Sequence, residues 1–381
     1  MIDMRVAIDC TPALFYTGGI HIYVRNLVGA LSQIDKENDY LLFYNLWGHL
    51  RNRSLYINQS NFKLSKEYLP GLVKRFLMKN TPFSCSPMIG RVDIFHSTDF
   101  KGFKLTRGER WINTVHDLIV PLFPELVPKA NLNRVMDYFK NYLPNADFII
   151  TISESSKRDI IKILKWPEDR IEVIYDAADI SLQPGSEQEV KEVLGFDQPY
   201  ILAVSTLEPR KNYPSLFRAF DLVRDAHKGP IKLVVVGQLG WLYDDIFTTH
   251  KKCRFGDDIV ILTNIDTTQL GILYSGAEFF VHPSLYEGFG LPILEAQHMG
   301  KAVLAGNNSS IPELVSDSAI LVDVKNEEEI VKGMLTLLEN QDLRAKLIQK
   351  GYINIKRFSW EKTARETLAV YQKVFHKMGK K

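Results

Sequence analysis

Residues 277–295 read AEFFVHPSLYEGFGLPILE, and this stretch decides the fold. Its first part is a short apolar run, typical of a strand buried on both faces of a parallel sheet. A glycine-containing loop follows, and Pro292 suits the first turn of a helix. The stretch therefore predicts a strand, a loop that carries Glu287, and a helix with Glu295 about one turn inside it.

The same alternation of strand and helix runs along the whole chain. The predicted strands lie at 4–10, 92–98, 110–117, 146–153, 170–176, 200–206, 231–237, 258–264, 277–284, 302–306 and 319–323. Such a pattern makes parallel sheets covered by helices, with ligands at the carboxyl ends of the strands. We therefore expect an α/β protein of two Rossmann-like, doubly wound domains facing a central cleft.

The length of 381 residues also favours two domains, because a single core rarely grows beyond about 250–300 residues. The polar, turn-rich run at 177–190 is the expected linker. We assign residues 1–178 to an N-terminal domain and 179–356 to a C-terminal domain. Residues 357–381 are then a C-terminal helix that packs back towards the N-terminal domain.

Composition excludes several classes of protein. The formal net charge is only +2, so we expect no nucleic-acid partner. The three cysteines lack CxxC spacing, which argues against a disulfide framework or a zinc site. The N-terminus does not read as a signal peptide and no apolar run reaches about 18 residues, so we expect a cytoplasmic protein.

Two adjacent cations, Arg210 and Lys211, stand between a predicted strand and a predicted helix in STLEPRKN, residues 205–212. A guanidinium fork and a lysine point charge beside a helix amino end suit a diphosphate. Taken alone, the pair could equally be a solvated basic loop.

Two signals in the first half are weaker. The loop at 17–20, TGGI, has Gly18 and Gly19, whose amides could approach an anion, but a plain tight turn fits as well. His116 ends a predicted strand, where a histidine can contact a sugar or move a proton. A purely structural histidine is the more frequent case.

The carboxylates Glu287 and Glu295 could be the acid and base of a glycoside hydrolase, metal ligands, or anchors for a polyhydroxylated ligand. No two aspartates in the chain are separated by one residue, which disfavours a Mg²⁺-bridging site. A hydrolase would leave Arg210 and Lys211 without a role. A ribose diphosphate suits both the loop amides and the carboxylates.

The element EGFGLPILE, within a match that runs continuously from 282 to 315, resembles the retaining glycosyltransferases of family four. That family has the architecture called GT-B and an E-x7-E motif, and TLEPRKN and VHD follow in its order. One departure is Ser205-Thr206, where many members carry Gly-Arg. Another is YDAAD in the linker, at 175–179.

The resemblance implies roles for residues at matching positions. Arg210 and Lys211 would hold the diphosphate of a nucleotide-sugar donor, Glu287 would contact the transferred sugar, and His116 would face that sugar. Glu295 would bind the ribose. The remaining donor-binding positions would be Gly18, Gly19, Ser205, Thr206, Gly237, Ile265, Gly288, Phe289, Gly290 and Leu291.

The implied activity is retaining, metal-independent transfer of a hexose, from GDP-mannose or UDP-glucose, to a glycan or lipid-linked glycan in polysaccharide biosynthesis. The N-terminal domain would take the acceptor and the C-terminal domain the donor, with no cofactor beyond this co-substrate. Two alternatives remain open: a nucleotide-sugar epimerase of the same fold, and a non-catalytic nucleotide-sugar binding protein.

The segment EYLPGLVKRFLMKNTPF, residues 67–83, reads as a basic amphipathic helix. Val73 and Phe76 belong to its apolar face, and Lys74 and Lys79 lie elsewhere. Such a helix can lie on an anionic membrane, here the inner face of the cell membrane. The alternative is an ordinary surface helix whose apolar face packs on its own domain.

Overall fold

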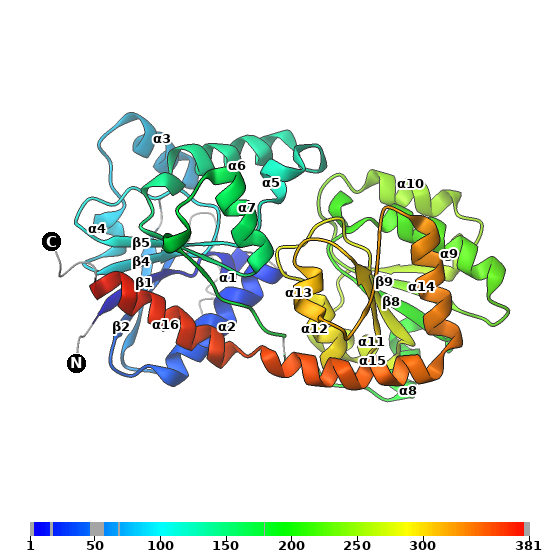
Figure 1. Ribbon diagram of the computed structural model, residues 1–381. Helices are drawn as coiled ribbons and strands as arrows, with labels where there is room; N and C mark the ends of the chain where they lie inside the picture. The colour runs from blue at the N-terminus through cyan, green and yellow to red at the C-terminus, as the bar shows by residue number, and fades with distance from the viewer. Residues whose placement is uncertain (1–3, 16–17, 46–56, 68, 179, 377–381) are drawn as a thin grey trace. The chain divides into compact units, whose positions relative to one another are not determined.

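The computed structural model describes residues 4–15, 18–45, 57–67, 69–178 and 180–376, which form two compact units (Figure 1). Unit 1 is made of Met1–Leu122, Lys129–Asp176 and Ser359–Lys381. Unit 2 is made of Phe123–Pro128 and Ala177–Phe358. The main part of unit 2 begins at Ala177, just before the expected boundary at 178–179, and ends at Phe358, just after the expected one at 356–357, whereas the inclusion of Phe123–Pro128 was not expected.

The sheet of unit 1 has seven parallel strands in the order β3-β2-β1-β4-β5-β6-β7. Their bounds are β1 Arg5–Asp9, β2 Asp39–Asn45, β3 Phe62–Glu67, β4 Ile94–Ser97, β5 Arg110–Val115, β6 Phe148–Thr151 and β7 Ile171–Val173. Both faces of the central strands are covered, and all four residues of β4 and of β6 are buried. Strands buried in this way read as continuous apolar runs.

The helices of unit 1 are α1 Pro12–Phe15, α2 Gly19–Ile34, α3 Gly71–Asn80, α4 Ser86–Ile89, α5 Ile119–Leu122, α6 Lys129–Asn141, α7 Glu154–Leu164 and α16 Trp360–His376, with 3₁₀ turns at Leu143–Asn145 and Glu168–Arg170. The last helix, α16, lies beside α2, so the two ends of the described chain belong to one unit (Figure 1). Ala364, Val370 and Tyr371 of α16 join the core that α2 forms with β1.

The sheet of unit 2 has six parallel strands in the order β10-β9-β8-β11-β12-β13. Their bounds are β8 Tyr200–Val204, β9 Lys232–Val236, β10 Ile259–Leu262, β11 Phe279–His282, β12 Val303–Gly306 and β13 Ile320–Val322. The strand order reverses between β8 and β11. In open α/β sheets a ligand crevice forms at such a switch point, outside the carboxyl ends of the two strands.

The helices of unit 2 are α8 Glu187–Leu194, α9 Tyr213–Ala226, α10 Asp244–Lys252, α11 Thr267–Gly276, α12 Leu291–His298, α13 Ile311–Val315, α14 Glu327–Glu339 and α15 Gln341–Asn354, with 3₁₀ turns at Pro124–Leu126, Pro209–Lys211, Gly256–Asp258 and Ile355–Arg357. Helix α8 begins within the run predicted as linker and extends beyond it, because Ser186 and Glu189 form a capping box that starts a helix there. The linker is therefore shorter than predicted.

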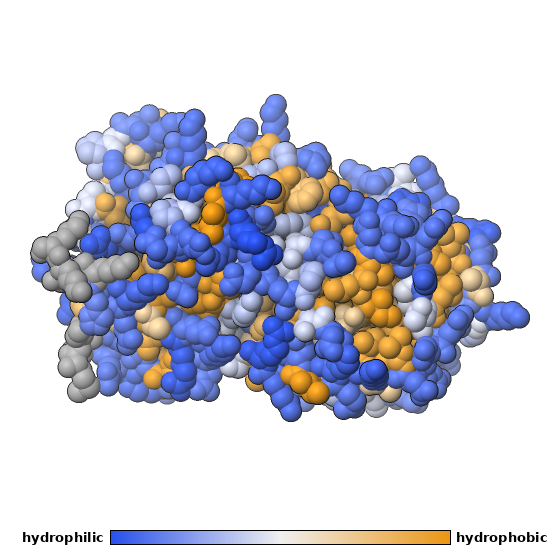
Figure 2. Space-filling view, viewed as in Figure 1, coloured by the Kyte–Doolittle hydropathy of each residue, from blue (hydrophilic) through white to orange (hydrophobic). Residues whose placement is uncertain are grey.

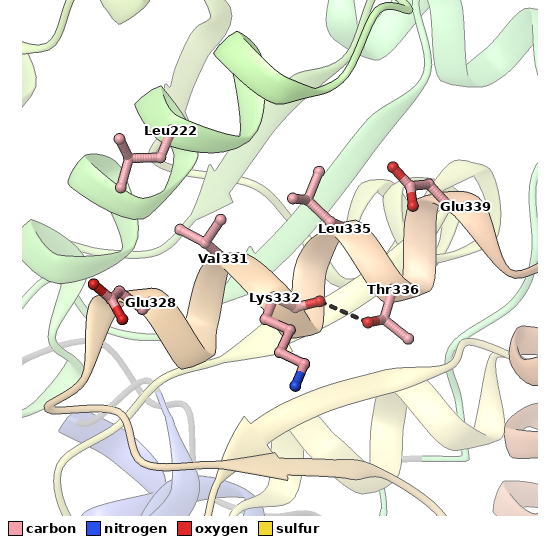
Figure 3. Close-up of a pocket in the computed structure, with 7 residues that line it drawn as sticks. All are labelled: Leu222, Glu328, Val331, Lys332, Leu335, Thr336 and Glu339. Carbon is pink, nitrogen blue, oxygen red and sulfur yellow. Dashed lines mark hydrogen bonds between the residues drawn. The ribbon is translucent and has the colours of Figure 1, made fainter.

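Helices α9 and α14 cover one face of this sheet with apolar side chains such as Phe217, Phe220 and Met334. On the side away from the sheet, the two helices form a groove, where Leu222 of α9 faces Val331 and Leu335 of α14 (Figure 3). Hydrophilic residues cover most of the face in Figure 2, and hydrophobic residues gather most densely over unit 2. Among the residues described, no helix is both long and apolar enough to cross a bilayer.

Candidate active site

Three charged residues come together at the switch point of unit 2. Arg210 and Lys211 end the 3₁₀ turn that follows β8, and Glu287 lies in the loop that follows β11. The two loops are joined by the backbone amide of Leu285, which donates to the carbonyl of Arg210 at 2.8 Å. Reversal of the strand order thus brings residues far apart in sequence to one edge of the sheet.

The carboxylate of Glu287 binds both cations, one with each oxygen. Lys211 Nζ lies 2.6 Å from Oε1, and Arg210 Nη1 lies 2.7 Å from Oε2. Arg210 also places Nε 2.5 Å from Oε1 of Glu208. Glu208, Lys211 and Glu287 are buried, whereas the Arg210 side chain is 19% exposed. The cluster of Glu208, Arg210, Lys211 and Glu287 therefore balances two cations with two carboxylates.

His282, the last residue of β11, completes this cluster. Its Nε2 lies 2.8 Å from Oε1 of Glu287 and 3.2 Å from Oγ of Ser284. Burial lowers the pKa of His282, although Glu287 acts in the opposite direction. The imidazole is therefore neutral at neutral pH, and its Nε2–H donates to the carboxylate.

Burial and neighbouring charges set the protonation of the cluster. Burial alone would raise the pKa of Glu287, but Arg210 and Lys211 outweigh it and hold that pKa well below its usual range. Burial and the adjacent Arg210 lower the pKa of Lys211, against the pull of Glu287 and Glu208. Glu287 is therefore an ionised acceptor and not a general acid at neutral pH.

Two serines after β12 fix the backbone of the loop that carries Glu287. The amide of Glu287 donates to Oγ of Ser309 at 2.9 Å. The Ser310 hydroxyl lies 3.0 Å from the carbonyl of Glu287 and 2.8 Å from that of Phe289. Gly290 has φ 116°, a conformation that favours glycine, and it caps helix α12. This loop, with Gly288, Phe289, Gly290 and Leu291, is buried and held in place.

Glu295 lies apart from the cations, on helix α12 as predicted. Its Oε2 accepts a hydrogen bond of 3.1 Å from the hydroxyl of Tyr274 on α11. Both residues are buried. The two glutamates of EGFGLPILE therefore have different partners, and they do not form an acid and base pair.

The remaining predicted positions of unit 2 follow β8, β9 and β10. Gly237 packs against the backbone after β8, where a Cβ would lie only 1.8 Å from the carbonyl oxygen of Ser205. No other residue fits there without moving the chain. Ser205, Thr206 and Ile265 are all half-buried, so the structure leaves part of each accessible.

Three predicted residues, Gly18, Gly19 and His116, belong to unit 1. Gly18 caps helix α2 with φ 112°, whereas Thr17 of the same loop lies outside the described residues. His116 is buried, and its Nε2 donates to the carbonyl of Thr98 at 2.9 Å. Burial lowers the pKa of His116, so the ring is neutral and Nδ1 carries the lone pair.

Five residues of unit 2 contact the predicted site but were not predicted to take part in it: Glu208, Tyr274, His282, Ser309 and Ser310. Glu208 stands two residues before Arg210, so its charge was visible in the sequence. His282 ends the strand that leads into the loop of Glu287, whereas Tyr274, Ser309 and Ser310 come from neighbouring segments that only the fold brings to the site.

Two family models match the chain in succession. Residues 17–182 match Glycosyltransferase Family 4, and residues 186–354 match Glycosyl transferases group 1. The O-antigen chain mannosyltransferase B of Escherichia coli is 32% identical over 283 residues, covering 73% of this chain and 74% of that protein. The chain belongs to the GT-B glycosyltransferases.

Further relatives and solved structures agree with this assignment. A glycosyltransferase of Campylobacter jejuni, named as an N-acetylgalactosaminyltransferase acting on a diphospho-undecaprenol-linked sugar, is 29% identical over 63% of this chain and 64% of its own length. Sucrose-phosphate synthase from Thermosynechococcus elongatus superimposes with a TM-score of 0.76, 20% identity, and coverage of 98% and 99%. Anabaena HepE with UDP-glucose gives a TM-score of 0.71, 16% identity, and coverage of 97% and 100%. The two structures show that this glycosyltransferase shares their fold.

Proposed function

We propose that this glycosyltransferase transfers a hexose from a nucleoside-diphosphate sugar to a glycan or lipid-linked glycan, with retention at the anomeric carbon and without a metal ion. The observation that carries the proposal is the pair of cations, Arg210 and Lys211, beside the carboxylate of Glu287 at the switch point of unit 2. Mannose from GDP-mannose and glucose from UDP-glucose are the two donors that we favour.

The cations have a chemical task in this reaction. When the bond between the sugar and the diphosphate breaks, negative charge builds up on the departing phosphate. Fixed cations in a site of low polarity stabilise that charge without needing to reorganise. Arg210 and Lys211 would do for the leaving group what a metal ion does elsewhere, and the departing phosphate would assist attack from the same face.

The relatives support a role in polysaccharide assembly. The 32% identical E. coli protein is named a mannosyltransferase of the O-antigen chain, and the related C. jejuni enzyme is named for a lipid-linked acceptor. HepE, which shares the fold, binds UDP-glucose. We therefore place the acceptor on a growing glycan, with the reaction at the inner face of the cell membrane.

A donor screen tests the function. Purified protein is mixed with UDP, GDP and ADP sugars, and the matching donor should raise the melting temperature, because a ligand at 100 times its Kd stabilises by about 2.7 kcal/mol. Transfer is then followed with the matching donor, EDTA and glycan acceptors, and NMR reports the anomeric configuration. An altered free nucleotide sugar would indicate an epimerase, and donor binding without glycan extension would indicate a binding protein.

Helix α3 supports the membrane contact. Phe76 is 64% exposed and Val73 42% exposed, whereas Lys74 is buried beside Glu67 with Nζ 3.6 Å from Oε2. The helix thus turns two apolar side chains outward, while Lys74 and the apolar side chain of Met78 are buried. Lys79 adds positive charge to the exposed side. Tyr68, and the side chains of Leu72 and Arg75, are not among the parts of the chain that the structure describes.

Flotation with liposomes that contain anionic lipid tests this contact. Replacing Val73 and Phe76 by serine should abolish flotation, since insertion of their side chains supplies the apolar part of membrane binding. The matched control is Leu222→Ser, which removes an exposed apolar side chain of unit 2 and should float like the wild type. Equal flotation of all three proteins would reject the contact.

A further inference from the structure

The cation pair of the active site is already neutralised before a ligand arrives. Both oxygens of Glu287 are in use, Oε1 at 2.6 Å from Lys211 and Oε2 at 2.7 Å from Arg210. A carboxylate and a phosphate present similar pairs of oxygens to such donors. In this arrangement Glu287 holds the cations in the way that a bound phosphate would.

A diphosphate at this site must therefore compete with Glu287. It brings negative charge to a cluster whose two cations are balanced by Glu208 and Glu287, and it can be held by Arg210 and Lys211 only if their contacts with Glu287 weaken. Buried cations without a partner are costly, so exchange of one anion for another is the favourable route. The exposed part of the Arg210 side chain gives an incoming anion access to the pair.

We propose that donor binding exchanges the Glu287 carboxylate for the donor's diphosphate on Arg210 and Lys211, an inference that rests on the proposed function. His282 retains the released carboxylate. Glu287 is then a competitor of the diphosphate before it becomes a partner of the sugar. His282 is a positioning residue in this scheme, because it acts on the substrate only through Glu287.

The structure supplies what keeps Glu287 near the site after the exchange. His282 Nε2 lies 2.8 Å from Oε1, on a ring that stacks on Phe280 with an interplanar angle of 24°. Ser309 and Ser310 bind the backbone of Glu287 itself. The backbone of Glu287 therefore stays in place during the exchange, and Oε2, freed from Arg210, becomes available to a sugar hydroxyl. No covalent bond or proton transfer is required.

The test is the affinity of nucleoside diphosphate for Glu287 variants, measured by calorimetry with UDP, GDP and inorganic pyrophosphate. Glu287→Gln removes the competing charge, so it should bind the matching nucleoside diphosphate and pyrophosphate at least about fivefold more tightly, yet transfer sugar far more slowly. The contrast is Glu295→Gln, which should weaken the nucleoside diphosphate and leave pyrophosphate unchanged, since its proposed partner is the ribose.

A second measurement protects the test against a folding defect. Glu287→Gln removes the carboxylate that pairs with the buried Lys211 and leaves Arg210 with Glu208, so the unliganded variant should melt at a lower temperature and gain more from added nucleotide than the wild type. Glu287→Asp keeps the charge on a shorter side chain. Its melting temperature should also be lower than that of the wild type and should also rise more with added nucleotide, but both differences should be smaller than in Glu287→Gln.

The outcomes separate this inference from the proposed function. If the wild type binds UDP or GDP and Glu287→Gln binds them equally or more weakly, Glu287 does not compete with the diphosphate and the exchange is overturned. If the wild type binds no nucleoside diphosphate at all, the proposed function fails, and the exchange fails with it. A His282→Gln variant with unchanged affinity for donor and unchanged kcat would remove His282 from the scheme.

Discussion

The hydroxyl of Tyr274 on α11 donates a hydrogen bond of 3.1 Å to the carboxylate of Glu295 on α12, and both side chains are buried. This bond fixes the direction in which the second glutamate of EGFGLPILE presents its other oxygen. In the proposed complex that oxygen accepts from the donor's ribose, so a residue that contacts no substrate sets the geometry of nucleotide binding.

Replacing Tyr274 by phenylalanine removes this hydrogen bond, together with a longer contact of 3.3 Å from the same hydroxyl to the carbonyl of Pro292. We expect a rise of about fivefold in KM for the donor, which corresponds to the roughly 1 kcal/mol of an ordinary hydrogen bond, with kcat nearly unchanged. The matched control is Tyr200→Phe, which loses a buried hydroxyl bonded to the carbonyl of Leu273 and should leave KM as it was. A loss confined to kcat would contradict a role in ribose binding.

Lys211→Ala removes a buried cation at the proposed position of the leaving phosphate. Loss of one such preorganised group costs about 100- to 1000-fold in kcat, and we expect a fall of that size in sugar transfer. Donor binding should suffer much less, because Arg210 remains. The measurement is transfer of labelled sugar under single-turnover conditions, and near-normal turnover would exclude Lys211 from catalysis.

Ser310→Ala tests the support of the loop that carries Glu287. The Ser310 hydroxyl is buried between the carbonyls of Glu287 and Phe289, and its removal leaves them short of a donor. We expect the free energy of unfolding to fall by about 1–3 kcal/mol in urea titrations. Thr336→Ala, which deletes an exposed hydroxyl bonded to the carbonyl of Lys332 (Figure 3), should change it by less than about 0.5 kcal/mol.

Unit 1 should lose stability in mild acid because of His96. This buried residue bonds Tyr371 and Thr114, and burial, with a smaller contribution from His116, lowers its pKa to about 3. The unfolded histidine titrates near 6.5, so between these values the unfolded state binds more protons and stability falls as pH falls.

From neutral pH to about pH 5, His96 alone should reduce the free energy of unfolding by about 2 kcal/mol. The buried His116 adds to the effect in unit 1, since burial lowers its pKa, and His282 acts in the same direction in unit 2. Urea titrations at a series of pH values should show the slope, and His96→Gln should flatten it even if it lowers stability overall. An unchanged slope in that variant would contradict the assignment.

Much of the fold could be predicted because buried parallel strands are apolar along their length. The apolar runs around Phe280, Val235 and Ile150 are strands β11, β9 and β6 in the structure. Strand β3 escaped prediction because it lies at the sheet edge, where FKLSKE keeps only Phe62 and Glu67 buried. Strand β2 was also missed, although DYLLFYN is mostly apolar. The membership of Phe123–Pro128 in unit 2 had no local signal, because it depends on tertiary packing.

The candidate site, like the fold, could be predicted only in part. Arg210, Lys211 and Glu287 could be singled out because each stands in a loop that follows a buried strand, and because Arg210 and Lys211 are adjacent cations. Their mutual contact could not, since it depends on β8 and β11 being neighbours although Lys211 and Glu287 are 76 positions apart in the sequence. His282 ends a strand, as His116 was predicted to do, and it was not singled out because a histidine in that position is most often structural.

Neither unit is one continuous piece of chain, and this bears on how such proteins can evolve. Unit 1 is completed by α16, whose Tyr371 bonds His96 of β4 across 275 residues. A single genetic crossover near residue 177, between genes of two related enzymes, would join one parent's α2 to the other parent's α16. Exchange of whole units between relatives therefore needs at least two breakpoints, which makes new pairings of unit 1 with unit 2 rarer than the two-unit layout suggests.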